Sequence, residues 1–158
     1  MNSLAHAIEL TEGIRASLEA EVAVAREERV LIRRMDADGL NARAVKRAEF
    51  NTRTAGLMVS LGRTLAEAAS ELGLAEVTMD ALQANAPVEG RRMSALLAEV
   101  RALAKTLSEL DALNRMLSQR ALSYVRAHLA VLSPKPAAYD RRGSGAIAER
   151  TTTFVRVA

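Results

Sequence analysis

The chain contains 158 residues and carries a formal net charge of +3. Apolar residues make up 49% of it, but aromatic residues only 3%, and both Cys and Trp are absent. The absence of Cys excludes disulfides and zinc sites built on thiolates. A composition dominated by Ala, Leu and Val favours seams between helices over a thick globular core with aromatic anchors.

The positive charge is concentrated at the C-terminal end. Residues 1–132 hold 17 basic and 17 acidic residues, whereas residues 133–158 hold five basic and two acidic residues. A body of balanced charge is unlike a nucleic-acid-binding domain, which presents a basic face, so we expect no nucleic-acid partner. The basic tail leaves two interpretations open: contact with an anionic surface, or a segment that its charges keep solvated.

No segment has the pattern of a membrane-directed sequence. The apolar runs are much shorter than the ~18 residues that a membrane span needs. The N-terminal stretch MNSLAHAIELTEGIR contains early acidic residues and no continuous apolar core, unlike a secretory signal. We therefore expect a cytoplasmic protein without stable membrane insertion.

Apolar residues spaced by three and four predict two long helices in the first half of the chain. The first is expected over residues 3–36 with Ser3 as its N-cap, and the second over residues 40–72 with Gly73 just beyond its end. The stretch MDADGLN between them is either a loop or a weak point in one longer helix. The core-facing residues expected in the first helix are Leu4, Ile8, Ile14, Leu18, Val22, Ala25, Ile32 and Met35. Those expected in the second are Val45, Ala48, Ala55, Met58, Leu65 and Leu72.

A short connector helix is expected over residues 78–85, with Thr78 as its cap. Asn85, Pro87 and Gly90 are expected to end it, because residues of these types commonly end helices. The next long helix is therefore expected to begin at about residue 91.

The last long helix, expected over residues 91–132, has mostly apolar residues at positions a and d of nearly six heptads. Its a positions are Met93, Val100, Leu107, Asn114, Ala121 and His128, and its d positions are Leu96, Leu103, Leu110, Leu117, Tyr124 and Val131. A helix of about 40 residues is about 60 Å long, and such helices pack most economically by folding back on each other. We predict an all-α fold: an elongated, coiled-coil-like antiparallel bundle of three long helices over residues 1–132, with the connector helix and a flexible basic tail over residues 133–158.

Asn114 and the residues after Leu117 depart from the heptad pattern. A polar residue at an a position either fixes the register of a coiled coil or bonds to the backbone of a partner. A second apolar stripe also runs beside the weakened original one, and it consists of Leu122, Val125, Leu129 and Leu132. Either the core face drifts onto this stripe, because a straight helix drifts ~20° per heptad, or the stripe binds an amphipathic segment of another protein.

The sequence lacks the motifs of enzymes and metal sites. It has no glycine-rich phosphate loop, no HExxH motif, no nucleophile elbow and no Cys. His6 and His128 have no second ligand at the spacing of a metal site, and the carboxylates alternate with Arg and Lys as on a solvated helix face. We expect neither an enzyme nor a bound metal or cofactor.

The order of features in the last helix and the tail resembles the FlgN family of flagellar type III export chaperones. The helix LNRMLSQRALSYVRAHLAVL contains Asn114 and ends in a Leu-x-Pro element at residues 132–134. A short spacer then leads to YDRRG at residues 139–143, which is similar to the Tyr-x-x-x-Gly element of the family's flexible tail. The earlier features match in order as well: an acidic-rich first helix, a second helix, a Leu-Gly-Leu turn at residues 72–74 and a short helical connector.

The resemblance implies a cytoplasmic chaperone that binds the hook–filament junction proteins, hook-associated proteins one and three, and delivers them to the export gate without using ATP or a metal. It implies substrate contact through the C-terminal amphipathic helix, at Asn114, Leu117, Leu122, Val125, Leu129 and Leu132. It also implies docking on the cytoplasmic domain of the gate protein FlhA through Tyr139, Asp140 and Gly143. Arg141 and Arg142 make this tail motif more basic than the family pattern.

Two other functions fit the same pattern. A structural coiled-coil adaptor with no export role would self-associate and would not bind junction proteins. A nucleic-acid-binding protein would use the basic tail, and its binding would depend steeply on salt. The chain itself is expected to be a monomer or a weak homodimer.

Overall fold

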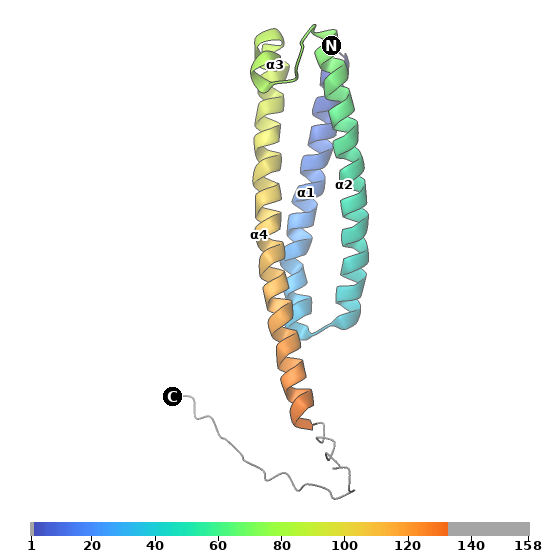
Figure 1. The fold of residues 1–158 in the computed structure, drawn as a ribbon, viewed down its shortest axis with the longest axis vertical. Coiled ribbons are helices and arrows are strands. Elements are labelled where there is room, and N and C mark those ends of the chain that lie inside the picture. The colour runs from blue at the N-terminus through green and yellow to red at the C-terminus, as the bar shows by residue number, and fades with distance from the viewer. Residues whose placement is uncertain (1, 133–158) are drawn as a thin grey trace, which may run out of the picture. The chain divides into compact units, whose positions relative to one another are not determined.

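The computed structural model describes residues 2–132, and this part of the chain consists of α-helices without strands. The helices are α1 (Asn2–Arg34), α2 (Ala37–Glu71), α3 (Met79–Asn85) and α4 (Pro87–Leu132) (Figure 1). The predicted all-α fold of long helices that pack together is confirmed. The tail over residues 133–158, which we expected to be flexible, lies outside the described residues.

Contacts divide the chain into two units, Met1–Leu122 and Ser123–Ala158. In the first unit, α1 packs against both α2 and α4 (Figure 1). Thr11 of α1 contacts Met93 near the start of α4, and Ala25, further along α1, contacts Asn114, further along α4. These two helices therefore run in the same direction, and α2 runs antiparallel to them. In the second unit, the described residues 123–132 are helical and exposed.

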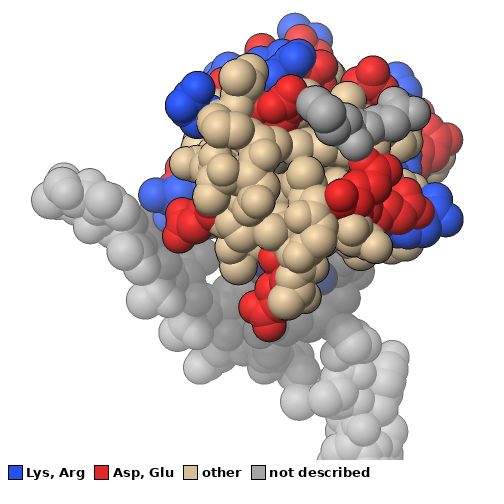
Figure 2. Space-filling view, turned by 90° about the horizontal axis from the view of Figure 1, so that it is seen from above, with Lys and Arg blue, Asp and Glu red and all other residues tan. Residues whose placement is uncertain are grey.

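The short helix α3 covers one end of the core of the first unit. Viewed toward this end, uncharged side chains gather in the middle of the surface and charged side chains lie mostly around the rim (Figure 2). Leu82 of α3 and Met93 of α4 are fully buried. The Thr78 hydroxyl oxygen caps α3 by accepting a hydrogen bond from the Ala81 N–H at 3.1 Å, as predicted.

A turn of only two residues separates α1 from α2. Met35 has a left-handed backbone conformation with a φ of 53°, and the Asp36 carboxylate caps α2 by accepting a hydrogen bond from the Gly39 N–H at 2.9 Å. A Cβ at Gly39 would lie 2.6 Å from a carboxylate oxygen of Asp36, so a larger residue here would displace the capping side chain. The stretch MDADGLN thus breaks the helix, but α2 resumes at Ala37 rather than at residue 40 because Asp36 supplies an early cap.

Two expected helix starts differ from the structure. Ser3 lies inside α1 rather than capping it, and its hydroxyl donates a hydrogen bond to Glu71. Helix α4 begins at Pro87 rather than at about residue 91, because proline has no N–H to satisfy and its fixed φ suits the first helical position. Gly90 lies in the first turn of α4, where a Cβ would come within 2.8 Å of the Gln83 backbone. It allows α3 and α4 to pack closely and does not end a helix.

The apolar stripes predicted for α1 and α4 form most of the core. The α1 stripe is buried except for Met35, which is exposed in the turn. The heptad positions of α4 from Met93 to Asn114 are buried or half-buried, whereas Tyr124, His128 and Val131 are exposed. The heptad pattern therefore describes the packing of α4 as far as Asn114.

The stripe predicted for α2 is largely wrong. Val45, Ala48, Ala55 and Met58 are exposed, and only Leu65 and Leu72 pack against the core. The buried face of α2 instead contains Arg43, Phe50, Leu61, Thr64, Ala68 and Ala69. Two faces of α2 have apolar residues at helical spacing, and the face with larger apolar side chains is buried because it removes more apolar surface from water.

The Asp36 cap generates a stability prediction. Asp36→Ala removes the side chain that satisfies the Gly39 N–H, so we expect the free energy of unfolding to fall by about 1 kcal/mol. Urea denaturation followed by circular dichroism measures this change. Asp38→Ala is the matched control, because it removes a carboxylate from the same turn without removing the cap. Equal losses for the two variants would show that the cap bond contributes nothing of its own.

Candidate functional site

A buried network of charges joins the three long helices near the middle of the first unit. Glu21 of α1 and Arg43 of α2 are each only 7% exposed, and the Arg43 guanidinium donates a hydrogen bond to the Glu21 carboxylate. Arg47 of α2 donates to the same carboxylate at 2.7 Å and to Asp111 of α4. Glu28 lies 3.3 Å from the Arg43 Nε. The network therefore joins α2 to both α1 and α4.

The sequence analysis missed this network, because it treated the carboxylates as members of a solvated face. One signal was available. Buried residues recur along α1 at heptad spacing, and one of them is acidic. They are Ala7, Thr11, Ile14, Leu18, Glu21, Ala25 and Ile32. An acidic residue at such a position is buried with a partner, and this pattern identifies Glu21. Nothing in the linear pattern identifies Arg43 and Arg47 as its partners.

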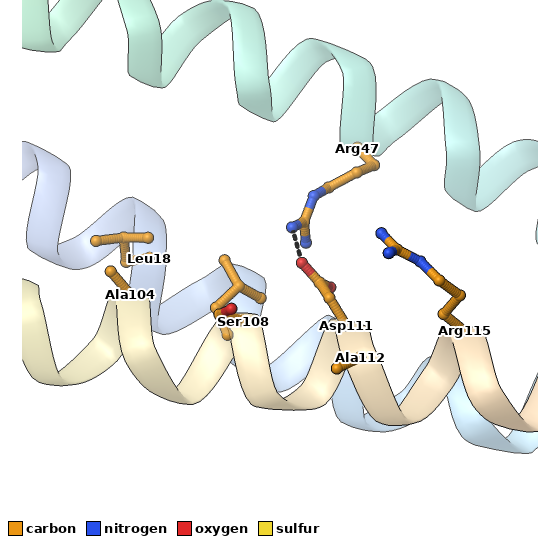
Figure 3. A pocket seen from close by; sticks show the side chains of 8 residues that line it. Leu18, Arg47, Ala104, Ser108, Asp111, Ala112 and Arg115 are labelled. Atoms are coloured by element: carbon orange, nitrogen blue, oxygen red, sulfur yellow. Dashed lines mark hydrogen bonds and ion pairs between the residues drawn. The ribbon is translucent and has the colours of Figure 1, made fainter.

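Two neighbouring hollows lie over this network, in the groove between α2 and α4. Their volumes are about 340 and 490 Å³, and both are lined by Arg47, Asp111 and Arg115. Figure 3 shows Arg47 reaching from α2 to Asp111, with the side chain of Arg115 extending into the same space. The carboxylates around the groove are paired with arginines, which suits them to holding helices together rather than to acid–base chemistry.

The described residues contain no site with the composition of a metal centre. Across residues 2–132, no group of three or more His, Asp or Glu side chains is arranged to hold a metal ion. His128 pairs instead with Tyr124 one turn away, with ring centroids 4.2 Å apart. His6 lies 3.5 Å from the Glu9 carboxylate on the exposed face of α1.

Asn114 lies in the seam between α1 and α4, where it is 3% exposed. Its side-chain amide donates a hydrogen bond to the Ala25 carbonyl at 2.8 Å, and its oxygen accepts one from the Arg29 Nε at 3.4 Å. Both polar ends of the side chain are therefore satisfied by α1. Of the two roles considered from the sequence, this geometry corresponds to fixing the register, and Asn114 presents no exposed surface to a partner. Leu117 is half-buried one turn later.

The second apolar stripe of α4 is exposed throughout. Its members Leu122, Val125, Leu129 and Leu132 are 54%, 38%, 56% and 77% exposed. Tyr124 and Val131, on another side of the same turns, are exposed as well. The core face therefore does not pass onto the second stripe, as register drift would require. The last turns of α4 leave two apolar surfaces uncovered within the described chain.

Helix α4 has more residues after its contact with α1 than α1 has. Ala25 of α1 lies beside Asn114 of the parallel helix α4. Helix α1 ends at Arg34, nine residues after Ala25, whereas α4 continues to Leu132, 18 residues after Asn114.

The remaining predicted site residues cannot be placed. Tyr139, Asp140 and Gly143 lie outside the described residues. Within residues 2–132, no helix combines the length and the apolar character that crossing a membrane requires.

Comparison with known proteins places the sequence in a family. The family described as FlgN protein matches residues 1–146, which is most of the chain. No curated protein matches the sequence, and neither does any solved structure.

The charge network predicts a large effect from one substitution. Glu21→Gln leaves the buried Arg43 without its main counter-charge, so we expect the free energy of unfolding to fall by about 3 kcal/mol. Chemical denaturation measures this value. The control is Glu99→Gln, which breaks an exposed pair with Arg15 and should change stability little. A loss for Glu21→Gln as small as that for Glu99→Gln would contradict a structural role of the network.

Proposed function

The chain belongs to the FlgN family of flagellar export chaperones, and on that premise we propose that it binds hook–filament junction proteins and delivers them to the export gate. The substrates are hook-associated proteins one and three, and binding takes place in the cytoplasm. The single observation that carries this proposal is the exposed second stripe of α4, formed by Leu122, Val125, Leu129 and Leu132.

The proposed mechanism is passive covering of apolar surface. Segments of a junction protein that later pack in the assembled flagellum expose apolar faces beforehand, and an amphipathic helix binds most readily to an apolar stripe at helical spacing. A specific interface of ordinary size buries about 1,200 Å² or more in total. Because the substrate must be released at the gate, binding is reversible, and the chaperone contributes no chemical step.

Asn114 and Leu117 have a supporting part in this proposal. Asn114 is held by α1, and Leu117 is half-buried. We assign them to fixing α4 in the bundle so that the turns after them are presented as a preformed helix. A preformed helix loses little conformational entropy when it binds a substrate.

The tail motif is proposed to dock on the cytoplasmic domain of the gate protein FlhA. Tyr139 with Asp140 and Gly143 carries this role, as the resemblance implies. An aromatic side chain such as Tyr139 is a favourable anchor for a shallow groove, because it buries a large apolar area with few rotatable bonds. The family match favours an export chaperone over a structural adaptor with no export role.

Removing the second stripe should abolish substrate capture. The triple substitution Leu122→Ser, Val125→Ser and Leu129→Ser removes three exposed apolar side chains. We expect the affinity for the terminal region of a hook-associated protein to fall by a factor on the order of 100 or more, from the apolar area lost. Isothermal titration calorimetry measures the affinity, and circular dichroism should show unchanged helix content.

The matched control is the double substitution Tyr124→Ser and Val131→Ser. These side chains are also exposed in the same turns but lie on a different side of α4. The control should bind the substrate nearly as the natural chain does. Equal loss of binding in both variants, or unfolding of the triple variant, would show that the second stripe is not the substrate surface.

Tyr139→Ala should separate the two proposed roles. We expect substrate affinity to be unchanged and binding to the purified FlhA cytoplasmic domain to weaken at least about tenfold, as for loss of an aromatic anchor. Titration with each partner in turn measures both affinities. If both fell together, the tail and the helix would form one site.

A further inference from the structure

Helix α2 presents an unpartnered face with heptad spacing. Its residues are Val45, Ala48, Thr52, Ala55, Val59, Gly62 and Ala66, and we call them the α2 face. Every one of them is exposed, and Val45 and Val59 are 60% and 75% exposed. The spacing alternates between three and four over six intervals, which is the pattern of a seam that packs against another helix.

The α2 face lies on the opposite side of the helix from the residues that pack in the bundle. The buried residues Phe50, Leu61 and Ala68 point toward the core. Because a helix has 3.6 residues per turn, the α2 face lies about half a turn around the helix axis from these buried residues. No other described part of the chain has to move for a helix to pack there.

Packing within the chain does not require the glycines at positions 56 and 62 of α2. A Cβ added at Gly56 or Gly62 would meet no atom within 4 Å. Glycine is nonetheless one of the least favourable residues in the interior of a helix. Gly62 belongs to the α2 face, and Gly56 lies at its border. Both would allow close approach of a second helix.

The charges beside the α2 face determine which partner fits. With Val45 at position a, the e row of the heptads contains Glu49, Gly56, Arg63 and Ser70, and the g row contains Ala44, Asn51, Met58 and Leu65. Glu49 and Arg63 are exposed and lie at equal distances in sequence from Gly56. In an antiparallel pair of helices, residues of the e row face those of the partner's e row. A parallel pair would instead place each charge opposite the uncharged g row.

We propose that the α2 face is the interface of a reversible homodimer, in which α2 pairs with α2 of a second copy in antiparallel orientation. The twofold axis passes near Gly56, so that Thr52 packs beside the partner's Gly62 and Ala55 beside the partner's Val59. Glu49 then faces the partner's Arg63, and Arg63 faces the partner's Glu49. The charge pattern is self-complementary only in this arrangement.

The dimer goes beyond the proposed chaperone function and does not depend on it. The α2 face extends from Val45 to Ala66 and is about 32 Å long at 1.5 Å per residue. One helix pair of this length gives an interface at the low end of specific interfaces. We therefore expect dissociation at micromolar or higher concentrations.

The test is sedimentation equilibrium of the full chain from low micromolar to near-millimolar concentration. The natural chain should shift from monomer to dimer and no further. Glu49→Arg and Arg63→Glu should each remain monomeric, because each places like charges opposite each other in both pairs. An equimolar mixture of the two variants should form dimers again, because every pair then joins opposite charges. The double variant with both substitutions should also dimerise.

Val88→Arg is the matched control, because it introduces a charge at an equally exposed apolar position on α4. It should dimerise like the natural chain, and circular dichroism should show that all variants keep their helix content. The proposal is overturned if the natural chain stays monomeric throughout. It is equally overturned if the single charge reversals dimerise normally or if their mixture does not. If the natural chain stays monomeric and Glu49→Arg lowers its affinity for the substrate, the α2 face binds a different protein and not a second copy.

Discussion

Paired charges in the middle of the bundle fix how its three long helices are aligned. Apolar heptads alone specify alignment weakly, because shifting one helix by a heptad brings similar side chains together again. Glu21 changes this, because it is buried and its partners Arg43 and Arg47 come from α2. A shifted α2 would leave Glu21 buried without its counter-charge, which costs several kcal/mol. Arg47 extends the constraint to α4 through Asp111, and Asn114 aligns α4 with α1 through the Ala25 carbonyl.

This alignment has a consequence for function. With Asn114 held beside Ala25, α1 ends while α4 still has several turns to go. The apolar residues of those turns are exposed: Leu122, Val125, Leu129 and Leu132 on one side and Tyr124 and Val131 on another. In the proposed function, these exposed turns are the part of α4 that binds a partner. The same division between an internal face and a free face recurs in α2, whose small and apolar outer residues are exposed.

Local sequence signals predicted local structure well. Thr78 and Gly73 were identified as cap and stop, and the heptads of α4 described its packing as far as Asn114. The prediction of the buried face failed for α2, which has apolar residues on two faces. The spacing of apolar residues does not indicate which of two such faces is buried. It also misjudged Pro87 and Gly90, since the same residues end one helix or begin the next. The buried network of charges could not be predicted, because the sequence of one helix does not indicate which positions of another helix it contacts.

The central claim is that the last turns of α4 are the substrate surface, and hydrogen–deuterium exchange of the full chain tests it most directly. The backbone amides of residues 122–132 would be followed with and without the terminal region of a hook-associated protein from the same organism. The account predicts strong protection of this segment on binding, with little change in the segment of α4 that packs in the bundle. Protection confined to the groove between α2 and α4, or unchanged exchange over residues 122–132 in a saturated complex, would contradict it.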